Sequence, residues 1–201
     1  MDDDAREQAL LTALTTEHFV LQTGRSATVA ESVGRTTIFL SLLSAALIGL
    51  GFVSGNGSLL RPYLGAVLPT LVVTGLLTFG RLVQNMVENS LDLQRMQRIR
   101  AWYHRRLGDQ DFFADAETPG GAMRSAWTAV GARPGRWQLL LTAAALVGAV
   151  NALLLGLGAA LLAGLAGLST GPAVLVGVPV ALVAFAAQLA YINRASISMT
   201  H

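Results

Sequence analysis

The chain has 201 residues, of which 53% are hydrophobic and 13% are charged, whereas soluble globular proteins carry about 25% charged residues. It contains no cysteine, so disulfides, thiolate metal sites and cysteine nucleophiles are excluded. The charged residues, with arginine as the only basic type beside histidine, are concentrated in residues 2–35 and 81–136 and are nearly absent from 37–80 and 138–193. This distribution predicts apolar membrane segments that alternate with polar segments, and not one globular core.

The first 36 residues predict a polar helix that precedes the first apolar stretch. The opening sequence MDDDAREQ is acidic, and because a secretory signal begins with basic residues, we expect no cleaved signal. Residues 5–21 follow a helical pattern with leucines on one side, whereas Gly24 and Gly34 are expected to weaken its continuation. This amphipathic helix would either cap the long helix predicted below or act as a sensor arm.

Four apolar stretches can be matched to a bilayer core of about 30 Å, which takes roughly 20 helical residues to cross. Residues 37–53 and 63–80 flank the turn-forming sequence SGNGSLLR, and residues 138–168 and 172–192 flank STGP. The third stretch, about 31 residues long, must tilt or leave the hydrocarbon at one end. A soluble bundle would need polar helix faces, which these stretches lack. The sequence therefore predicts an all-α integral membrane protein with four transmembrane helices in two hairpins.

Arginine bias predicts the orientation of these helices. Arg61 is the only basic residue in the two short connections, whereas residues 81–136 alone carry nine arginines. Because arginine-rich segments stay in the cytoplasm, both termini and the middle segment are expected there, with the protein in the inner cell membrane. The predicted divisions are a cytoplasmic N-terminal helix (1–36), a transmembrane hairpin with a helical extension (37–107), a cytoplasmic linker with a short helix (108–136) and a second transmembrane hairpin (137–201).

The second span is predicted to continue as a long cytoplasmic helix, because residues 81–107 contain no glycine or proline. Residues along this helix recur at alternating spacings of four and three, which defines a heptad seam with two polar members. The seam comprises Leu82, Met86, Asn89, Leu93, Met96, Arg100, Tyr103 and Leu107. It indicates either a coiled-coil stalk between subunits or packing against the protein's own N-terminal helix.

Anionic lipid headgroups are candidate partners for basic residues on this extension and for an aromatic residue before the third span. Each well-placed arginine would contribute about 1 kcal/mol to the free energy of membrane binding. These residues are Arg95, Arg98, Arg105, Arg106, Arg136 and Trp137. Alternatively, the arginines form a solvated helix face that only orients the protein. The acidic linker at 108–121 lacks the spacing of an EF-hand, so no metal is predicted, and the absence of a folded basic module argues against nucleic-acid binding.

Polar residues inside the predicted spans are few, and none is ionisable at mid-depth, which argues against a proton-coupled antiporter. The second span carries a polar residue every three or four positions, on one helix face. These candidates for a pore lining are Thr70, Thr74, Thr78, Arg81, Gln84 and Glu88. The alternative for the threonines is hydrogen bonding between helices, worth about 0.6 kcal/mol on average. Asn151 and Gln188 are the polar candidates in the second hairpin.

The third span carries a small residue at every fourth position, which lets helix backbones approach closely. This stripe comprises Ala144, Gly148, Ala152, Gly156, Ala160 and Gly164. Its partner is expected to be either the fourth span, at Gly177 and Ala181, or another subunit.

The stretch EHFVLQTGRSATVAESVGRTTIFLSLLSAALIGLGF resembles segments of uncharacterised multi-span membrane proteins of actinobacteria, over about the first fifth of the chain. The plan of a membrane hairpin with long cytoplasmic helices also looks like membrane effectors of bacterial defence systems. These resemblances imply a membrane protein and carry no activity.

Functional hypotheses follow from the spans and the helical extension. The three histidines are scattered, and no hydrolase, metalloprotease or phosphate-loop motif is present, so we expect no enzyme and no cofactor. The leading hypothesis is a homo-oligomeric channel whose first two spans line the pathway and whose extension organises the subunits. The alternative is a non-catalytic membrane scaffold or signalling subunit that presents cytoplasmic helices to a partner, and the third is a small-molecule transporter.

Overall fold

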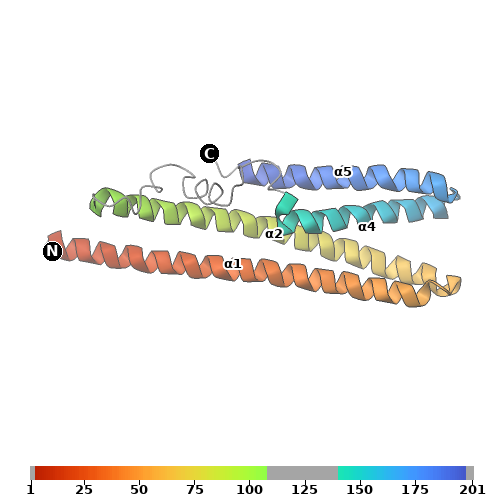
Figure 1. Cartoon of the computed structure of the whole chain (residues 1–201), viewed down its shortest axis with the longest axis horizontal. Coiled ribbons are helices and arrows are strands. Elements are labelled where there is room, and N and C mark those ends of the chain that lie inside the picture. Colours follow the sequence, from red (N-terminus) through yellow and green to blue (C-terminus); the bar gives the residue numbers. More distant parts are fainter. Residues whose placement is uncertain (1–2, 108–139, 198–201) are drawn as a thin grey trace. The chain divides into compact units, whose positions relative to one another are not determined.

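The computed structural model describes residues 3–107 and 140–197. These residues form four α-helices: α1 (Asp3–Val53), α2 (Gly57–Leu107), α4 (Ala143–Leu165) and α5 (Thr170–Ile197) (Figure 1). Each of the four is long and apolar enough to cross a membrane, so the prediction of an all-helical chain with four membrane-length helices is confirmed. The predicted linker and short helix (108–136) lie outside the described residues.

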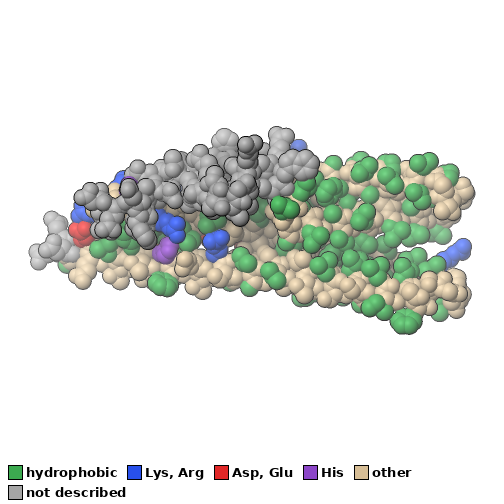
Figure 2. Space-filling model, viewed as in Figure 1, with side chains coloured by type: hydrophobic (Ala, Val, Ile, Leu, Met, Phe, Trp, Pro, Cys, Tyr) green, Lys and Arg blue, Asp and Glu red, His purple; other side chains and the backbone are tan. Residues whose placement is uncertain are grey.

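The chain divides into two compact units, and α1 and α2 each contribute to both. The polar unit comprises residues 1–30 and 86–136, and the apolar unit comprises residues 31–85 and 137–201. The apolar unit contains the described parts of all four predicted spans. Many leucines and valines on its helices are exposed, as the space-filling view illustrates (Figure 2). Helices with apolar surfaces of this kind are suited to contact with lipid.

Helix α1 continues through Gly24 and Gly34 without interruption, so the predicted weakening does not end the helix. A glycine inside a helix costs about 1 kcal/mol relative to alanine, which the flanking helix-forming residues outweigh. The turn after α1 is closed by Asn56, whose Oδ1 accepts hydrogen bonds from the amide and hydroxyl of Ser58 at 3.2 and 2.6 Å. This side-chain cap starts α2.

Helix α2 begins at Gly57, six residues before the predicted second span, and contains Pro62 and Pro69. Proline removes an i→i−4 hydrogen bond, but transmembrane helices tolerate this loss where neighbouring groups compensate. The helix then continues to Leu107, so the second span has the helical extension expected from the lack of glycine and proline. Basic side chains in its last turn interact favourably with the helix C-terminus.

Helix α4 is shorter than the predicted third span, with 23 residues in place of about 31. It begins after Thr142, whose Oγ1 accepts a hydrogen bond at 3.2 Å from the amide three residues further on. It ends in a Schellman motif, in which the amide of Leu168 bonds the carbonyl of Ala163 across Gly167 (φ 97°). A helix of this length spans about 35 Å, so the strong tilt expected of a 31-residue span is not required.

Helix α5 extends beyond the predicted fourth span (172–192) at both ends, because it begins at Thr170 and ends at Ile197. Pro172 lies in its first turn, where a missing amide hydrogen leaves no helical bond unmade.

Helices α4 and α5 pack closely along the small-residue stripe. A Cβ placed at Gly156 would lie 2.7 Å from both the carbonyl oxygen of Gly177 and the Cβ of Ala181. Ala144 and Ala152 of the same stripe are buried, whereas Gly164 has nothing within 4 Å of its Cβ position. The middle of the stripe therefore faces α5, and its far end is open.

Candidate functional site

An ion-pair cluster joins α1 to α2 where the predicted first and second spans meet their polar flanks. Arg81 donates to the Glu31 carboxylate from Nε at 3.0 Å and Nη2 at 3.1 Å, in a bidentate arrangement. One turn along α1, Arg35 Nε donates to the same carboxylate at 2.7 Å. The hydrogen bonds from Arg81 and then Arg35 lower the pKa of Glu31 to about 2. Glu31 is therefore ionised at neutral pH and holds two arginines.

The cluster lies at the depth where a bilayer would end. Glu31 is 22 residues from the end of α1 at Val53, and Arg81 is 24 residues from the start of α2 at Gly57. These separations correspond to about 33 and 36 Å of helix, against a hydrocarbon thickness of about 30 Å. With the α1–α2 turn at one bilayer surface, the ion pairs lie at the opposite surface, where charged groups are tolerated.

One turn beyond Arg81, the side chain of Asn85 is buried and 1% exposed. Its Nδ2 donates to Ser32 Oγ of α1 at 3.0 Å. Its Oδ1 has no hydrogen-bond partner among the described residues, although an unpaired buried acceptor costs about 1–3 kcal/mol. Asn85 thus links the two helices and leaves one acceptor unused beside the ion-pair cluster.

Two further amide side chains are buried at membrane depth. Asn151 of α4 is fully buried, and its Oδ1 occupies the space of the missing side chain at Gly75 of α2, next to the Phe39 ring. Gln188 of α5 is 8% exposed, and its Oε1 lies 2.8 Å from where a Cβ at Gly148 would be. Neither amide oxygen has a hydrogen-bond partner in the part of the chain that the structure describes. Each amide therefore fits against a glycine of a neighbouring helix.

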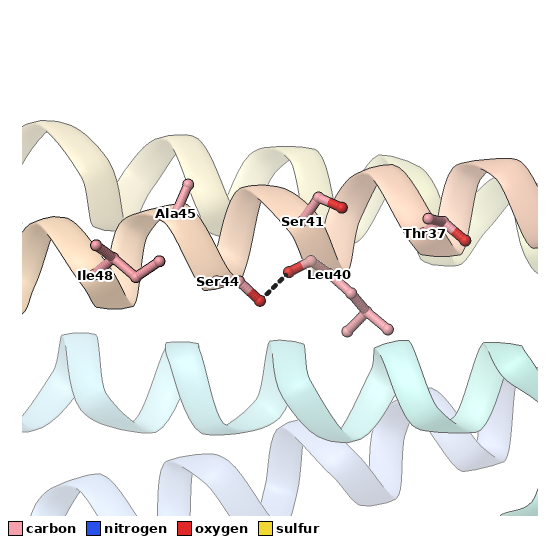
Figure 3. Close-up of a pocket in the computed structure, with 6 residues that line it drawn as sticks. All are labelled: Thr37, Leu40, Ser41, Ser44, Ala45 and Ile48. Atoms are coloured by element: carbon pink, nitrogen blue, oxygen red, sulfur yellow. Dashed lines mark hydrogen bonds between the residues drawn. The ribbon is translucent and has the colours of Figure 1, made fainter.

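A shallow groove of about 460 Å³ follows the membrane segment of α1 (37–53). It is lined by Thr37, Leu40, Ser41, Ser44, Ala45 and Ile48 (Figure 3). The three hydroxyl residues follow spacings of four and three and therefore share one helix face. Phe39 and Ala46, which contact α2 in the same unit, lie on the opposite side of α1. The groove is thus on the face of α1 that points away from α2, its outward face.

The three hydroxyls of the groove differ in their hydrogen bonding. Ser44 Oγ donates to the carbonyl of Leu40 at 2.9 Å, as the dashed line in Figure 3 marks. Thr37 and Ser41 make no side-chain hydrogen bond within the described part of the chain. Two outward hydroxyls in a membrane segment therefore remain available to groups from outside this chain.

In the polar unit, α1 and α2 pair within one chain. Leu21, Met96 and Ile99 form a buried core, and Leu14 and Tyr103 pack against it. The heptad seam of α2 thus contacts the chain's own N-terminal helix, which is the second of the two arrangements that its spacing indicated.

Polar contacts extend this pairing along both helices. Arg25 Nε donates to Asn89 Oδ1 at 2.8 Å, and Arg106 donates to both oxygens of Glu7 at 3.0 and 2.9 Å. The hydrogen bonds and charge of Arg106 lower the pKa of Glu7, and Glu7 raises the pKa of Arg106 in return. These contacts are exposed, so each contributes little to stability on its own.

The predicted pore-lining residues do not share one environment. Thr70 is exposed and donates to a carbonyl of its own helix at 2.8 Å, Thr74 is half-buried, and Thr78 is buried. Arg81 and Gln84 lie together, since Arg81 Nη1 donates to Gln84 Oε1 at 3.4 Å. The sixth residue, Glu88, is exposed in the polar unit.

The predicted headgroup contacts on α2 are all exposed: Arg95, Arg98, Arg105 and Arg106. Arg95 pairs with Asp92 at 3.5 Å, and Arg106 pairs with Glu7. Arg136 and Trp137 lie outside the described residues.

Sequence patterns did not single out Glu31, Ser32 or Gly75. The signal for Glu31 is its distance from the α1–α2 turn, which matches that of Arg81 and places the two charges side by side. Gly75 has no signal beyond being a glycine within a span, because its role depends on which helix packs there. Comparisons with protein-family models, curated proteins and solved structures find no match.

Proposed function

We propose that the protein is a homo-oligomeric channel of the inner cell membrane, with a pathway that forms between copies along the outward face of α1. In this proposal the four spans form two hairpins and both termini are cytoplasmic, in keeping with the arginine bias. The observation that carries the proposal is the groove on α1, where hydroxyl groups lie on the side of the helix opposite its contacts with α2.

Outward hydroxyls in a bilayer need a hydrogen-bond partner, which is either a carbonyl of their own helix, as for Ser44, or a group from another molecule. Thr37 and Ser41 bond nothing within the described residues, and hydrocarbon offers no acceptor. In the apolar window of α1, 6% is buried, compared with 39% in that of α4, so this helix is open to lipid, to a second copy or to water. Ser41 and Ala45, four residues apart, form the small-xxx-small pattern that lets membrane helices approach closely. Copies joined along this face would pair or hydrate the hydroxyls.

A passage through the interior of one copy is disfavoured, because the described core of the apolar unit is filled. Phe39, Val147 and Ile192 have no exposed surface. The polar surface that remains accessible at membrane depth includes the groove. The groove is therefore a better candidate for a pathway than the interior of one copy. The lining of the groove is neutral, and the cluster of Glu31 with Arg81 and Arg35 near its end has a net charge of +1.

Purified protein in nanodiscs and liposomes tests the proposal. We expect a mass of more than one chain in nanodiscs and a flux of monovalent ions from liposomes. Ser41→Trp fills the groove and should abolish most of the flux, whereas Leu42→Trp, at a position 46% exposed on another face of α1, is the matched control and should preserve it. A monomer in nanodiscs, or oligomers that pass no ions under any gradient, would reject the channel.

The second candidate is a non-catalytic scaffold or signalling subunit, and the polar unit favours it. Phe19 and Val20 of α1 are 66% and 59% exposed there, outside the predicted spans, although α1 already pairs with α2 through Leu21. Exposed apolar residues beside a formed helix pair can receive a partner. Oligomers without flux, together with a Ser41→Trp variant that behaves as the wild type, would favour this reading over the channel.

A further inference from the structure

We infer that the apolar unit binds one internal water molecule between Asn151 of α4 and Gln188 of α5, on the inner side of the bundle and separate from the groove on α1. The inference depends on the buried amides alone and is independent of the proposed channel.

The first support is the set of polar atoms that the protein buries without pairing. Asn151 has no exposed surface, and within residues 3–107 and 140–197 neither its Nδ2 nor its Oδ1 has a partner; Gln188 is 8% exposed, and its Oε1 has none there either. Internal waters bind at sites of this kind, where they make about three hydrogen bonds to otherwise unpaired groups. At membrane depth no bulk water is present to satisfy the amides in another way.

The second support is the spacing of the two amides. Gln188 Oε1 lies against Gly148, and Gly148 is three residues before Asn151 on α4. The Cβ atoms of positions three apart on a helix face are about 5–6 Å apart, so Gln188 approaches α4 within one turn of Asn151. A direct amide hydrogen bond requires about 2.9 Å, whereas two hydrogen bonds that meet at the tetrahedral angle of one water bridge about 4.5 Å. No direct hydrogen bond joins the buried atoms of the two amides within the described residues, which favours a bridging water.

Glycines and phenylalanines shape the site. A Cβ at Gly148 would come within 2.8 Å of Gln188 Oε1 and 3.3 Å of the Phe79 ring, and a Cβ at Gly75 would collide with Asn151 Oδ1. The two glycines therefore leave the volume that the amides use. The buried Phe79 ring borders this volume.

The chemistry of the donor set selects water over a divalent cation. The fully buried unpaired atoms of the two amides, within the described residues, are one nitrogen, which donates, and two oxygens, which accept. One water can accept the first bond and donate the other two. A hard divalent cation takes six or more oxygen ligands, and neither α4 nor α5 contains an acidic residue.

An experimental structure at about 2 Å resolution, determined in nanodiscs, tests the site directly. We expect density for one water within hydrogen-bond distance of both Asn151 and Gln188. A direct bond between the two amides, or rotation of either amide onto a helix carbonyl with no density between them, would overturn the inference.

Melting temperatures in detergent provide a second, independent measurement. Asn151→Leu and Gln188→Met each leave the remaining amide unpaired, so each should lower the melting temperature by about 4–8 °C. The double variant removes both amides, so its melting temperature should fall by clearly less than the sum of the decreases in the two single variants. Thr70→Val, which removes an exposed hydroxyl bonded to its own helix, is the control and should change little. Additive losses would show that the two amides do not share a water.

Discussion

Replacing Gly156 by alanine tests how closely α4 and α5 approach each other. The new Cβ would lie 2.7 Å from the carbonyl oxygen of Gly177 and 2.7 Å from the Cβ of Ala181, where ordinary contacts lie at 3.4–4 Å. A backbone oxygen cannot rotate away as a flexible side chain can, so the two helices have to separate locally. Overpacking of this kind costs about 1–3 kcal/mol, which corresponds to a melting temperature lower by about 2–12 °C.

Gly164→Ala is the matched control for this change, because it lies on the same helix and a Cβ there has nothing within 4 Å. Alanine favours the helix by up to about 1 kcal/mol relative to glycine, so this variant should melt at the same temperature as the wild type or higher. The assay is thermal unfolding in detergent, followed by circular dichroism. Equal melting temperatures for Gly156→Ala and Gly164→Ala would refute the close approach. A smaller oligomer with unchanged stability would assign the stripe to a contact between subunits.

Three further changes test the ends of the helices and the ion pairs. Since the pKa of Glu31 is lowered from 4.5 to about 2, its stabilising contribution is complete above about pH 4.5 and is lost as the pH falls to about 2. The difference in melting temperature between wild type and Glu31→Gln should shrink across that window, and a constant difference would contradict the ion pairs. Thr142→Ala removes the N-cap of α4 and should cost about 1 kcal/mol of stability, or about 2–4 °C in melting temperature. Thr142→Ser should retain the cap, so equal melting temperatures for the alanine and serine variants would exclude a capping role for Thr142. Gly167→Ala places a Cβ on a residue with φ of 97° and should cost about 1–2 kcal/mol, which a comparison of urea midpoints would detect.

The class and number of the helices could be predicted because long uncharged stretches have few alternatives to a membrane-length helix. The start of α4 could not be predicted, because the sequence of residues 138–142 is as compatible with a span as the residues after them. The helix begins where the hydroxyl of Thr142 accepts a hydrogen bond from a backbone amide. The continuity of α1 through Gly24 and Gly34 shows the limit of residue propensity, since a cost of about 1 kcal/mol per glycine does not end a helix of 51 residues.

Pairing partners were harder to predict than helices. The heptad spacing of α2 indicates that its seam is covered but not by which chain, and the buried contacts of Leu21 with Met96 and Ile99 are made by the chain's own α1. Asn151 and Gln188 could be selected as candidates because amides are rare in spans. The glycines against which these amides pack could not be predicted, because that assignment requires knowing which helices are neighbours.

Polar groups at membrane depth in the apolar unit face two directions, and the direction decides what each can do. Asn151 and Gln188 face inward against glycines, so changes there act on the stability of a single chain. Thr37 and Ser41 face outward from a helix that is barely buried, so changes there act on whatever covers that face. Substitutions that alter assembly or flux without altering melting should therefore cluster on the outward face of α1. If they cluster on α4 or α5 instead, the pathway does not run along α1 and the proposed channel is wrong in its central feature.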